Sequence, residues 1–169
     1  MDLKQFQQQL ARQQHEIEEA MRRTLPVKVG RLATDHYHEN FRKGGFVDGG
    51  LNPWQPTRRQ QSGSKSAAAN YGPLLSSRKN LYGSIKYIPG DYRVKVRSDL
   101  IYAAIHNRGG TIIQQRTRKK GGKGKKSLGL PKRVTIVIPQ RQFLGESKEL
   151  DEKIERTIDN ELEKIINNG

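Results

Sequence analysis

The sequence predicts an α+β protein: a small antiparallel sheet with helices packed on one face, long N-terminal and C-terminal helices, and an extended basic hairpin arm. Three observations predict this class. Apolar residues recur every three or four positions near both ends of the chain, which is the period of an amphipathic helix. Apolar and charged residues alternate over residues 92–98, which is the period of a strand. Residues 114–133 contain nine Lys and Arg residues and no acid, between two further predicted strands.

The N-terminal region predicts two helices. The first covers residues 2–25, with Asp2 as its cap and apolar positions at spacings of 3, 4, 7, 4 and 4 residues. These apolar positions are Leu3, Phe6, Leu10, Ile17, Met21 and Leu25. Pro26 either closes this helix or lies in the first turn of the next one. The second helix is expected to reach about Phe41, because the glycine-rich stretch that follows cannot remain helical.

Residues 44–80 are expected to be the least regular part of the chain. Their polar and small residues, with several glycines and prolines, favour a long surface loop. The only tryptophan, Trp54, lies between two prolines and is expected to anchor this loop in the core.

A hairpin and a short helix follow the loop. Residues 84–88 and 92–98 predict two strands joined by a turn that contains proline, glycine and aspartate. The short helix after them is expected to turn Ile101, Ala104 and Ile105 inward and to stop at a glycine pair.

Two more strands and a closing helix complete the predicted order. Residues 111–115 and 133–138 are the strands that flank the basic stretch. The last helix covers about residues 147–167, and its apolar positions are Leu150, Ile154, Ile158, Leu162 and Ile165. It is expected to pack on its own sheet, whereas the helix over residues 2–25 is expected to lie partly against an adjacent subunit.

Length and composition favour one soluble domain. The 169 residues suffice for one core, so we expect a single domain, 1–169. Its expected parts are N-terminal helices (1–43), an irregular loop (44–80), strands with a short helix and the basic arm (81–140), and a C-terminal helix (146–167). A hydrophobic content of 33% and a mean hydropathy of -0.88 leave much of the chain for water or protein contacts. The chain has no cysteine, no signal-peptide pattern and no apolar run long enough to cross a bilayer, so we expect a protein made in the cytoplasm.

The net charge of +15 is unevenly distributed. The basic arm contributes Arg116, Arg118, Lys119, Lys120, Lys123, Lys125, Lys126, Lys132 and Arg133. Residues 146–164 contain eight acids against four bases. A chain that is basic in its middle and acidic near its end is typical of a protein with partners of opposite sign: nucleic acid, an acidic protein surface or the next copy of itself.

No catalytic or metal-binding pattern emerges from the sequence. His36 and His38 lie about 200° apart around a helix, so they cannot share one ion. The stretch GGKGKKS resembles a phosphate-binding loop but lacks both the required glycine and the Ser or Thr directly after Gly124-Lys125. We therefore expect no catalytic residue, no metal and no cofactor.

The basic arm allows two interpretations. It is either a solvated loop without a partner, or a basic finger that contacts phosphates or an acidic protein surface. Because no aromatic residues interrupt the basic residues, base stacking is not expected, and any contact with nucleic acid would be made to the backbone.

Four segments, in this order, resemble one family. They are NPWQPTRR, which contains Trp54, LLSSRKNLYGSI, YAAIHNRGG, which contains Tyr102 and His106, and IPQRQFLGES, which contains Arg141. Together they resemble the tail-completion, or virion morphogenesis, proteins of tailed bacteriophages over roughly residues 40–165.

The resemblance implies a non-enzymatic virion protein, made in the cytoplasm of the bacterial host. Copies would form a ring, with sixfold symmetry, at the neck, at the end of the tail tube, and would help to join the tail to the DNA-filled head. The partners implied are other copies of the chain and neighbouring neck, tail-tube and connector proteins, with possible phosphate contacts to DNA in the channel. In the IPQRQFLGES corner, Phe143 and Leu144 would fill the core, Gly145 would allow the turn, and Arg141 would point to a neighbour.

Two other classes remain open on the sequence alone. A sequence-independent nucleic-acid-binding protein with a basic loop would share the charge of +15. A nuclease centred on His106 is disfavoured, because no set of metal ligands converges with it in the sequence.

Overall fold

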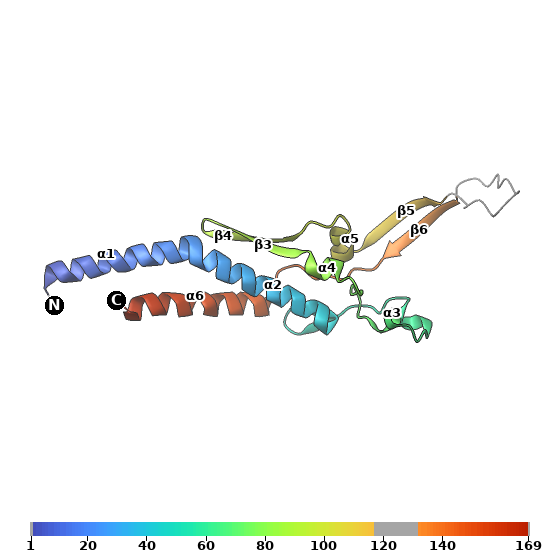
Figure 1. Cartoon of the computed structure of the whole chain (residues 1–169), viewed down its shortest axis with the longest axis horizontal. Helices are drawn as coiled ribbons and strands as arrows, with labels where there is room; N and C mark the ends of the chain where they lie inside the picture. The colour runs from blue at the N-terminus through green and yellow to red at the C-terminus, as the bar shows by residue number, and fades with distance from the viewer. Residues whose placement is uncertain (1, 117–131, 169) are drawn as a thin grey trace, which may run out of the picture.

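A long helix at the N-terminus runs along much of the molecule, with a second long helix and one hairpin beside it, and another hairpin projects beyond its end (Figure 1). The computed structural model describes residues 2–116 and 132–168. The elements in these residues are α1 (Leu3–Glu19), the π-helical turn η1 (Ala20–Thr24), α2 (Leu25–Lys43), β1 (Gly45–Val47), β2 (Leu51–Pro53), the 3-10 turn η2 (Gln60–Ser62), α3 (Ala67–Asn70), α4 (Asn80–Gly83), β3 (Ile85–Gly90), β4 (Arg93–Ser98), α5 (Ala103–Arg108), β5 (Gly110–Arg116), β6 (Lys132–Ile138) and α6 (Lys148–Asn168). The predicted α+β class, the long terminal helices and the hairpin that flanks the basic stretch are confirmed.

The two predicted N-terminal helices form one helical rod from Leu3 to Lys43, about 60 Å long at 1.5 Å per residue. Pro26 lies in the first turn of α2 and does not separate the helices. Because proline has no backbone N–H, it leaves the carbonyl of Arg22, four residues earlier, without its helical partner. That carbonyl accepts a hydrogen bond from the N–H of Tyr92, at the turn of the β3–β4 hairpin, at 3.2 Å. The hydrogen bond that Pro26 cannot donate within the helix is thus replaced by one from the hairpin turn.

Close packing holds the β3–β4 hairpin against α2. Gly30 gives α2 a bare surface, and a Cβ atom added there would lie 2.5 Å from the ring of Tyr87 and 2.8 Å from Val94. At the hairpin turn, the guanidinium of Arg22 pairs with Asp91 at 2.8 Å. The inward face of the hairpin thus contacts α2, and its charged face stays exposed.

The strands form three separate antiparallel pairs, β1–β2, β3–β4 and β5–β6. The sequence suggested one small sheet, because it contains no signal for how hairpins are joined. The junction between α5 and β5 accounts for the separation. Gly109 and Gly110 have φ angles of +73° and +153°, which favour glycine. The chain turns there, and β5–β6 extends away from β3–β4 (Figure 1).

The helix α6 packs against α2 and α1 and not, as expected, on a sheet. Its apolar stripe is the predicted one, with Leu150 buried and the other four positions half-buried. The side chain of Lys28 in α2 pairs with Glu161 in α6, and Gln13 in α1 donates to the carbonyl of Ile166 at 3.1 Å. The sheet was the wrong partner because α2 occupies the space between α6 and the hairpin.

The orientation predicted for the short helix is wrong. Ala103 is its buried residue, Ala104 is exposed, and Ile101 lies before the helix with 97% of its surface exposed. The helix α5 begins only at Ala103, so an inward face counted from Ile101 is displaced. Within the part of the chain that the structure describes, no helix is both long enough and apolar enough to cross a membrane.

The bare surface at Gly30 provides the first prediction. Gly30→Ala should lower the free energy of unfolding, because overpacking costs ~1–3 kcal/mol and exceeds the ~1 kcal/mol that alanine gains as a better helix former. The matched control is Gly83→Ala in α4, where an added Cβ has no atom within 4 Å. Urea unfolding of both variants measures the difference. Equal stability of the two variants would show that the hairpin does not press on α2.

Candidate functional site

Residues 139–147 form a corner without regular secondary structure, and this corner connects β6 to α6 at the centre of the molecule. Phe143 has 0% of its surface exposed, so its predicted role in the core is confirmed. Its ring lies 5.2 Å from the ring of Phe41, which in turn meets Trp54 edge to face at 5.5 Å. Trp54 is buried in this core, as predicted.

Asn107 of α5 holds the corner backbone. Its side-chain oxygen accepts hydrogen bonds from the N–H groups of Phe143 at 2.7 Å and Leu144 at 2.9 Å. Its side-chain nitrogen donates to the carbonyl of Leu144 at 3.0 Å. One amide side chain thus replaces the backbone partners that a strand or helix would supply.

Three further side chains bind carbonyl groups of the corner. The indole N–H of Trp54 donates to the carbonyl of Gln142 at 2.8 Å. The hydroxyl of Tyr37 donates to the carbonyl of Gly145 at 3.0 Å, and the side chain of Asn40 donates to that of Phe143 at 3.4 Å. These donors come from α2 and from the segment after β2, so the corner joins regions far apart in the sequence.

Arg141 does not point to a neighbour, and that prediction is wrong. Its exposed fraction is 6%, and its Nε and Nη2 atoms donate to the carbonyl of Gln55 at 3.0 and 2.9 Å. Its backbone N–H donates to the carbonyl of His106 at 2.8 Å. The side chain therefore turns inward to fasten the segment after Trp54 to the corner.

A pocket of about 320 Å³ lies beside Arg141. Tyr102 and His106, whose rings meet edge to face at 6.0 Å, line it together with Arg59. Burial, and then the charge of Arg141, lower the pKa of His106 from its ordinary value. His106 is thus a half-buried packing residue, and its neutral form is favoured.

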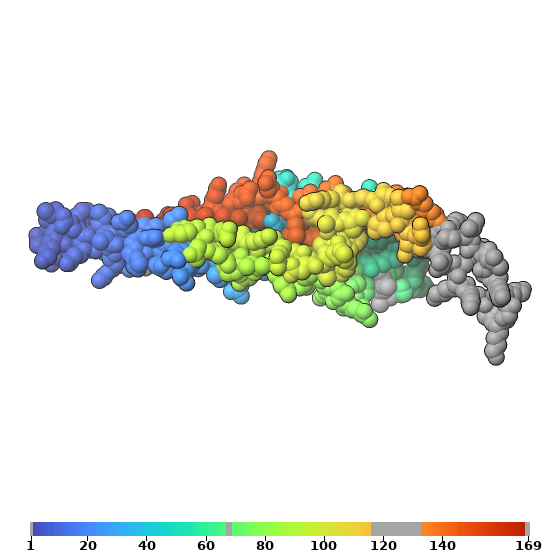
Figure 2. Space-filling view, turned by 90° about the horizontal axis from the view of Figure 1, so that it is seen from above, coloured from blue at the N-terminus to red at the C-terminus, as the bar shows by residue number. Residues whose placement is uncertain are grey.

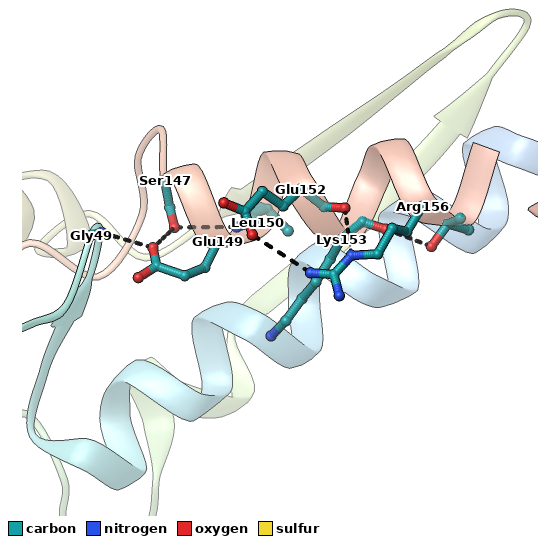
Figure 3. A network of polar contacts seen from close by, with 8 residues as sticks. Gly49, Ser147, Glu149, Leu150, Glu152, Lys153 and Arg156 are labelled. Carbon is teal, nitrogen blue, oxygen red and sulfur yellow. Dashed lines mark hydrogen bonds and ion pairs between the residues drawn. The ribbon is translucent and has the colours of Figure 1, made fainter. Parts of the chain in front are cut away.

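The N-terminus of α6 is tied to the turn between β1 and β2 (Figure 3). The carboxylate of Glu149 accepts hydrogen bonds from the N–H groups of Gly49 at 2.9 Å and Gly50 at 3.0 Å. In return, Asp48 accepts a hydrogen bond from the N–H of Lys148 at 3.1 Å. The hydrogen bond from Gly49 is the main cause that lowers the pKa of Glu149. Ser147 caps the helix by accepting from the N–H of Leu150.

The remaining predicted residues of the corner are less constrained. Leu144 is half-buried and packs against the core. Gly145 does not have a positive φ angle, so its backbone conformation does not itself require glycine, but an added Cβ atom would clash with the Nε2 atom of Gln142.

Of the basic arm, the structure describes only the strand ends. Arg116 faces Lys132 in the β5–β6 register, and Arg133 faces Gln115. Arg118, Lys119, Lys120, Lys123, Lys125 and Lys126 lie outside the described residues.

The described residues contain no group of three or more His, Asp or Glu side chains placed to hold a metal ion. The chemistry that the corner and its pocket offer is hydrogen bonding and positive charge.

Sequence reasoning missed Asn107, Asn40, Tyr37 and Arg59. Asn107 had the clearest signal, because an asparagine beside a glycine pair often bonds to nearby backbone. Arg59 lies in a stretch whose composition predicted only a surface loop, and no local signal indicates its pocket.

An elongated body with exposed apolar residues on its projecting parts is typical of a protein that assembles with other chains. A sequence model of the phage virion morphogenesis family matches residues 1–163. The chain belongs to this family, whose role is in the structure and assembly of phage particles. No curated protein and no solved structure matches the chain significantly.

The inward turn of Arg141 leads to a second prediction. Arg141→Ala should lower the free energy of unfolding by about 1–3 kcal/mol, because both hydrogen bonds to Gln55 come from a charged group. The control is Arg108→Ala at the exposed end of α5, which should stay within ~0.5 kcal/mol of the parent chain. Thermal and urea unfolding report both values. If Arg141→Ala proves as neutral as the control, the hydrogen bonds to Gln55 do not stabilise the corner.

Proposed function

We propose that this chain is a non-enzymatic structural protein of the phage neck. In this proposal, copies form a ring, with six members as the expected number, at the end of the tail tube, complete the tail and join it to the DNA-filled head. The match of residues 1–163 to the phage virion morphogenesis family carries the proposal. Four exposed surfaces of the described residues support it. They lie on α1, on the β3–β4 hairpin, on α6 and on β5–β6.

The helix α1 offers the first such surface. It has no buried residue, and its first turns extend past the end of α6 (Figure 1). Leu3, Phe6 and Leu10 recur on one face and are at least half exposed. An apolar stripe of this kind is stabilised when another chain covers it, so a neighbouring copy is the expected partner.

The β3–β4 hairpin and α6 offer two charged surfaces that fit each other. Arg93, Lys95 and Arg97 form an exposed row on β4, and Lys86 faces Arg97 directly. The hairpin lies uncovered on the face shown in Figure 2 (yellow-green). Like charges opposite one another destabilise a strand pair. Asp99 compensates Arg97 through an ion pair at 2.9 Å, so it is chiefly Arg93, Lys95 and Lys86 that are better accommodated beside an acidic partner.

The acidic row lies on α6. Glu155, Asp159 and Glu163 are exposed, spaced by four residues, and make no ion pair within the described part of the chain. Like charges at this spacing repel each other on one helix face. Alternate residues on a strand lie about 6.7 Å apart and residues four apart on a helix about 6 Å, so the two rows match closely over three positions.

A contact in which the β4 row of one copy meets the α6 row of the next is head-to-tail when the reverse contact is made with a different copy. A head-to-tail contact that closes on itself generates a ring. The charge rows are therefore compatible with a ring.

The arm formed by β5 and β6 supports contact beyond the ring. It projects from the body, and Ile112, Ile113 and Val137 are exposed along it. A two-stranded hairpin with exposed apolar residues on it is marginally stable alone. We propose that it docks on a neighbouring virion protein, with phosphate contacts to DNA as the alternative.

The charge rows provide the third prediction. Lys95→Glu and Asp159→Lys should each weaken self-association at low salt, and the double variant should recover it. Lys65→Glu, an exposed residue outside both rows, is the control. Sedimentation or native mass measurement reports the size of the assembly. An assembly that forms equally well in all variants would exclude these rows from the interface.

The fourth prediction tests the function itself. A phage that lacks this gene should yield filled heads and unjoined tails, and the gene supplied in trans should restore joining. Normal particles without the gene would exclude a role in joining.

The alternative, sequence-independent binding of nucleic acid, is favoured only by the basic charge of the arm. For ~4–6 phosphates per arm it predicts a log–log salt slope of about -4 to -5.

A variant of the arm distinguishes docking on a protein from contact with DNA. In this variant serine replaces Lys119, Lys120, Lys123, Lys125 and Lys126. Loss of joining with unchanged binding to duplex DNA would indicate a protein partner. Loss of both would indicate DNA in the channel. If neither changes, the arm has no role in joining.

A further inference from the structure

Two guanidinium groups, those of Arg59 and Arg141, line the pocket beside the corner. No Asp or Glu among the described residues lines it. Neither arginine makes an ion pair within the described residues. After burial, the charge of Arg59 is the cause that lowers the pKa of Arg141, so the two positive charges act on each other. Two partly buried charges of the same sign are unfavourable unless an anion joins them.

Two buried nitrogen atoms of the pocket residues also have no partner. The Nε atom of Arg59 and the Nδ1 atom of His106 are buried and have no hydrogen-bond partner among the described residues. The guanidinium of Arg59 uses only Nη2, which donates to backbone carbonyls including that of Gly72 at 2.8 Å. A donor buried without a partner is costly, and natural proteins rarely keep one without a reason.

The pocket wall contains strained backbone. Leu74, which lines the pocket, has a φ of +62°, and Lys79, next to another lining residue, has a φ of +47°. Both values lie in the left-handed region that residues with a Cβ atom rarely adopt. Such strain is concentrated at binding sites, where the surrounding structure holds it.

The shape of the pocket selects among anions. A guanidinium binds carboxylates and phosphates alike, so the rest of the pocket must distinguish them. Leu74, Leu75 and Leu81 supply apolar walls that suit the methylene groups of an acidic side chain. Duplex DNA presents its phosphates on the outside of a stiff cylinder, which fits a recessed pocket of about 320 Å³ poorly.

We propose that this pocket binds the carboxylate of a glutamate or aspartate side chain presented by another virion protein. Arg59 donates a hydrogen bond from its guanidinium group to the carboxylate. Arg141 contributes positive charge while it remains bonded to Gln55, and the apolar walls contact the side-chain stem. The proposal rests on the proposed function only for the source of the carboxylate, because binding of a free carboxylate does not require the ring.

Nuclear magnetic resonance on the purified full chain tests the site directly. The probes are a blocked Ala-Glu-Ala peptide and its isosteric Ala-Gln-Ala counterpart. The glutamate peptide should shift the Arg59 Nε–H and His106 ring signals saturably, with an affinity in the millimolar range expected for one carboxylate. The glutamine peptide should leave them unchanged. No shift with either peptide, or equal shifts with both, would overturn the proposal.

Two variants locate the effect. Arg59→Gln should weaken binding of the glutamate peptide roughly tenfold, because the loss of one charged hydrogen bond typically lowers affinity by about this factor. Arg58→Gln, next to it but exposed, should bind as the parent chain does. The melting temperature of each variant checks that it is folded, and the titrations of the parent chain stand whether or not Arg59→Gln folds.

Inorganic phosphate and a short DNA duplex separate the possible sources. If either shifts the same signals at lower concentration than the glutamate peptide, the pocket is a phosphate site and the proposal is wrong. In phage complementation, Arg59→Gln should reduce joined particles and Arg58→Gln should not. Peptide binding together with normal joining by Arg59→Gln would overturn the virion-protein source and leave the carboxylate site intact. Failure of the proposed function is distinct, because particles without the gene would then join normally.

Discussion

The structure depends on a corner of irregular backbone that is buried at its centre. Residues 139–147 cannot form the hydrogen bonds of a strand or a helix, yet they surround Phe143, which is fully buried. Buried amides need partners, and here side chains provide them: Asn107 for three groups, and Trp54, Tyr37 and Asn40 for one each. Since these side chains come from α2, α5 and the segment after β2, satisfying one short stretch of backbone also fixes the mutual positions of most of the molecule.

The stable core and the exposed apolar residues lie in different parts of the molecule. The core around the corner is closed by aromatic rings and hydrogen bonds, whereas α1 at one end and β5–β6 at the other contribute little to it. Apolar residues at those ends remain in contact with solvent. The central body can therefore fold before its surfaces meet other chains, and the projecting elements are free to adapt to them.

The sequence predicted the elements whose apolar residues recur with a clear period. It did not predict the features that depend on contacts between distant residues. The stripes of the long helices and the alternation in β4 follow from local patterns, so they were correct. The pair β1–β2 was missed because three-residue strands have no measurable period, although Asp48-Gly49 is a turn signal. The family resemblance implied that Arg141 points to a neighbour, whereas the distant carbonyl of Gln55 explains its inward turn. The pocket of Arg59 likewise depends on contacts that no window of sequence contains.

The side-chain bonds at the corner also determine when the protein can fold during its synthesis. The hydrogen bond from Tyr37 to Gly145 spans 108 residues, and that from Asn40 to Phe143 spans 103. The long helix therefore leaves the ribosome before the backbone that it must hold is translated. Contacts between residues so far apart in sequence form slowly, so the nascent chain exposes its helical apolar stripe until residues 139–147 have been synthesised.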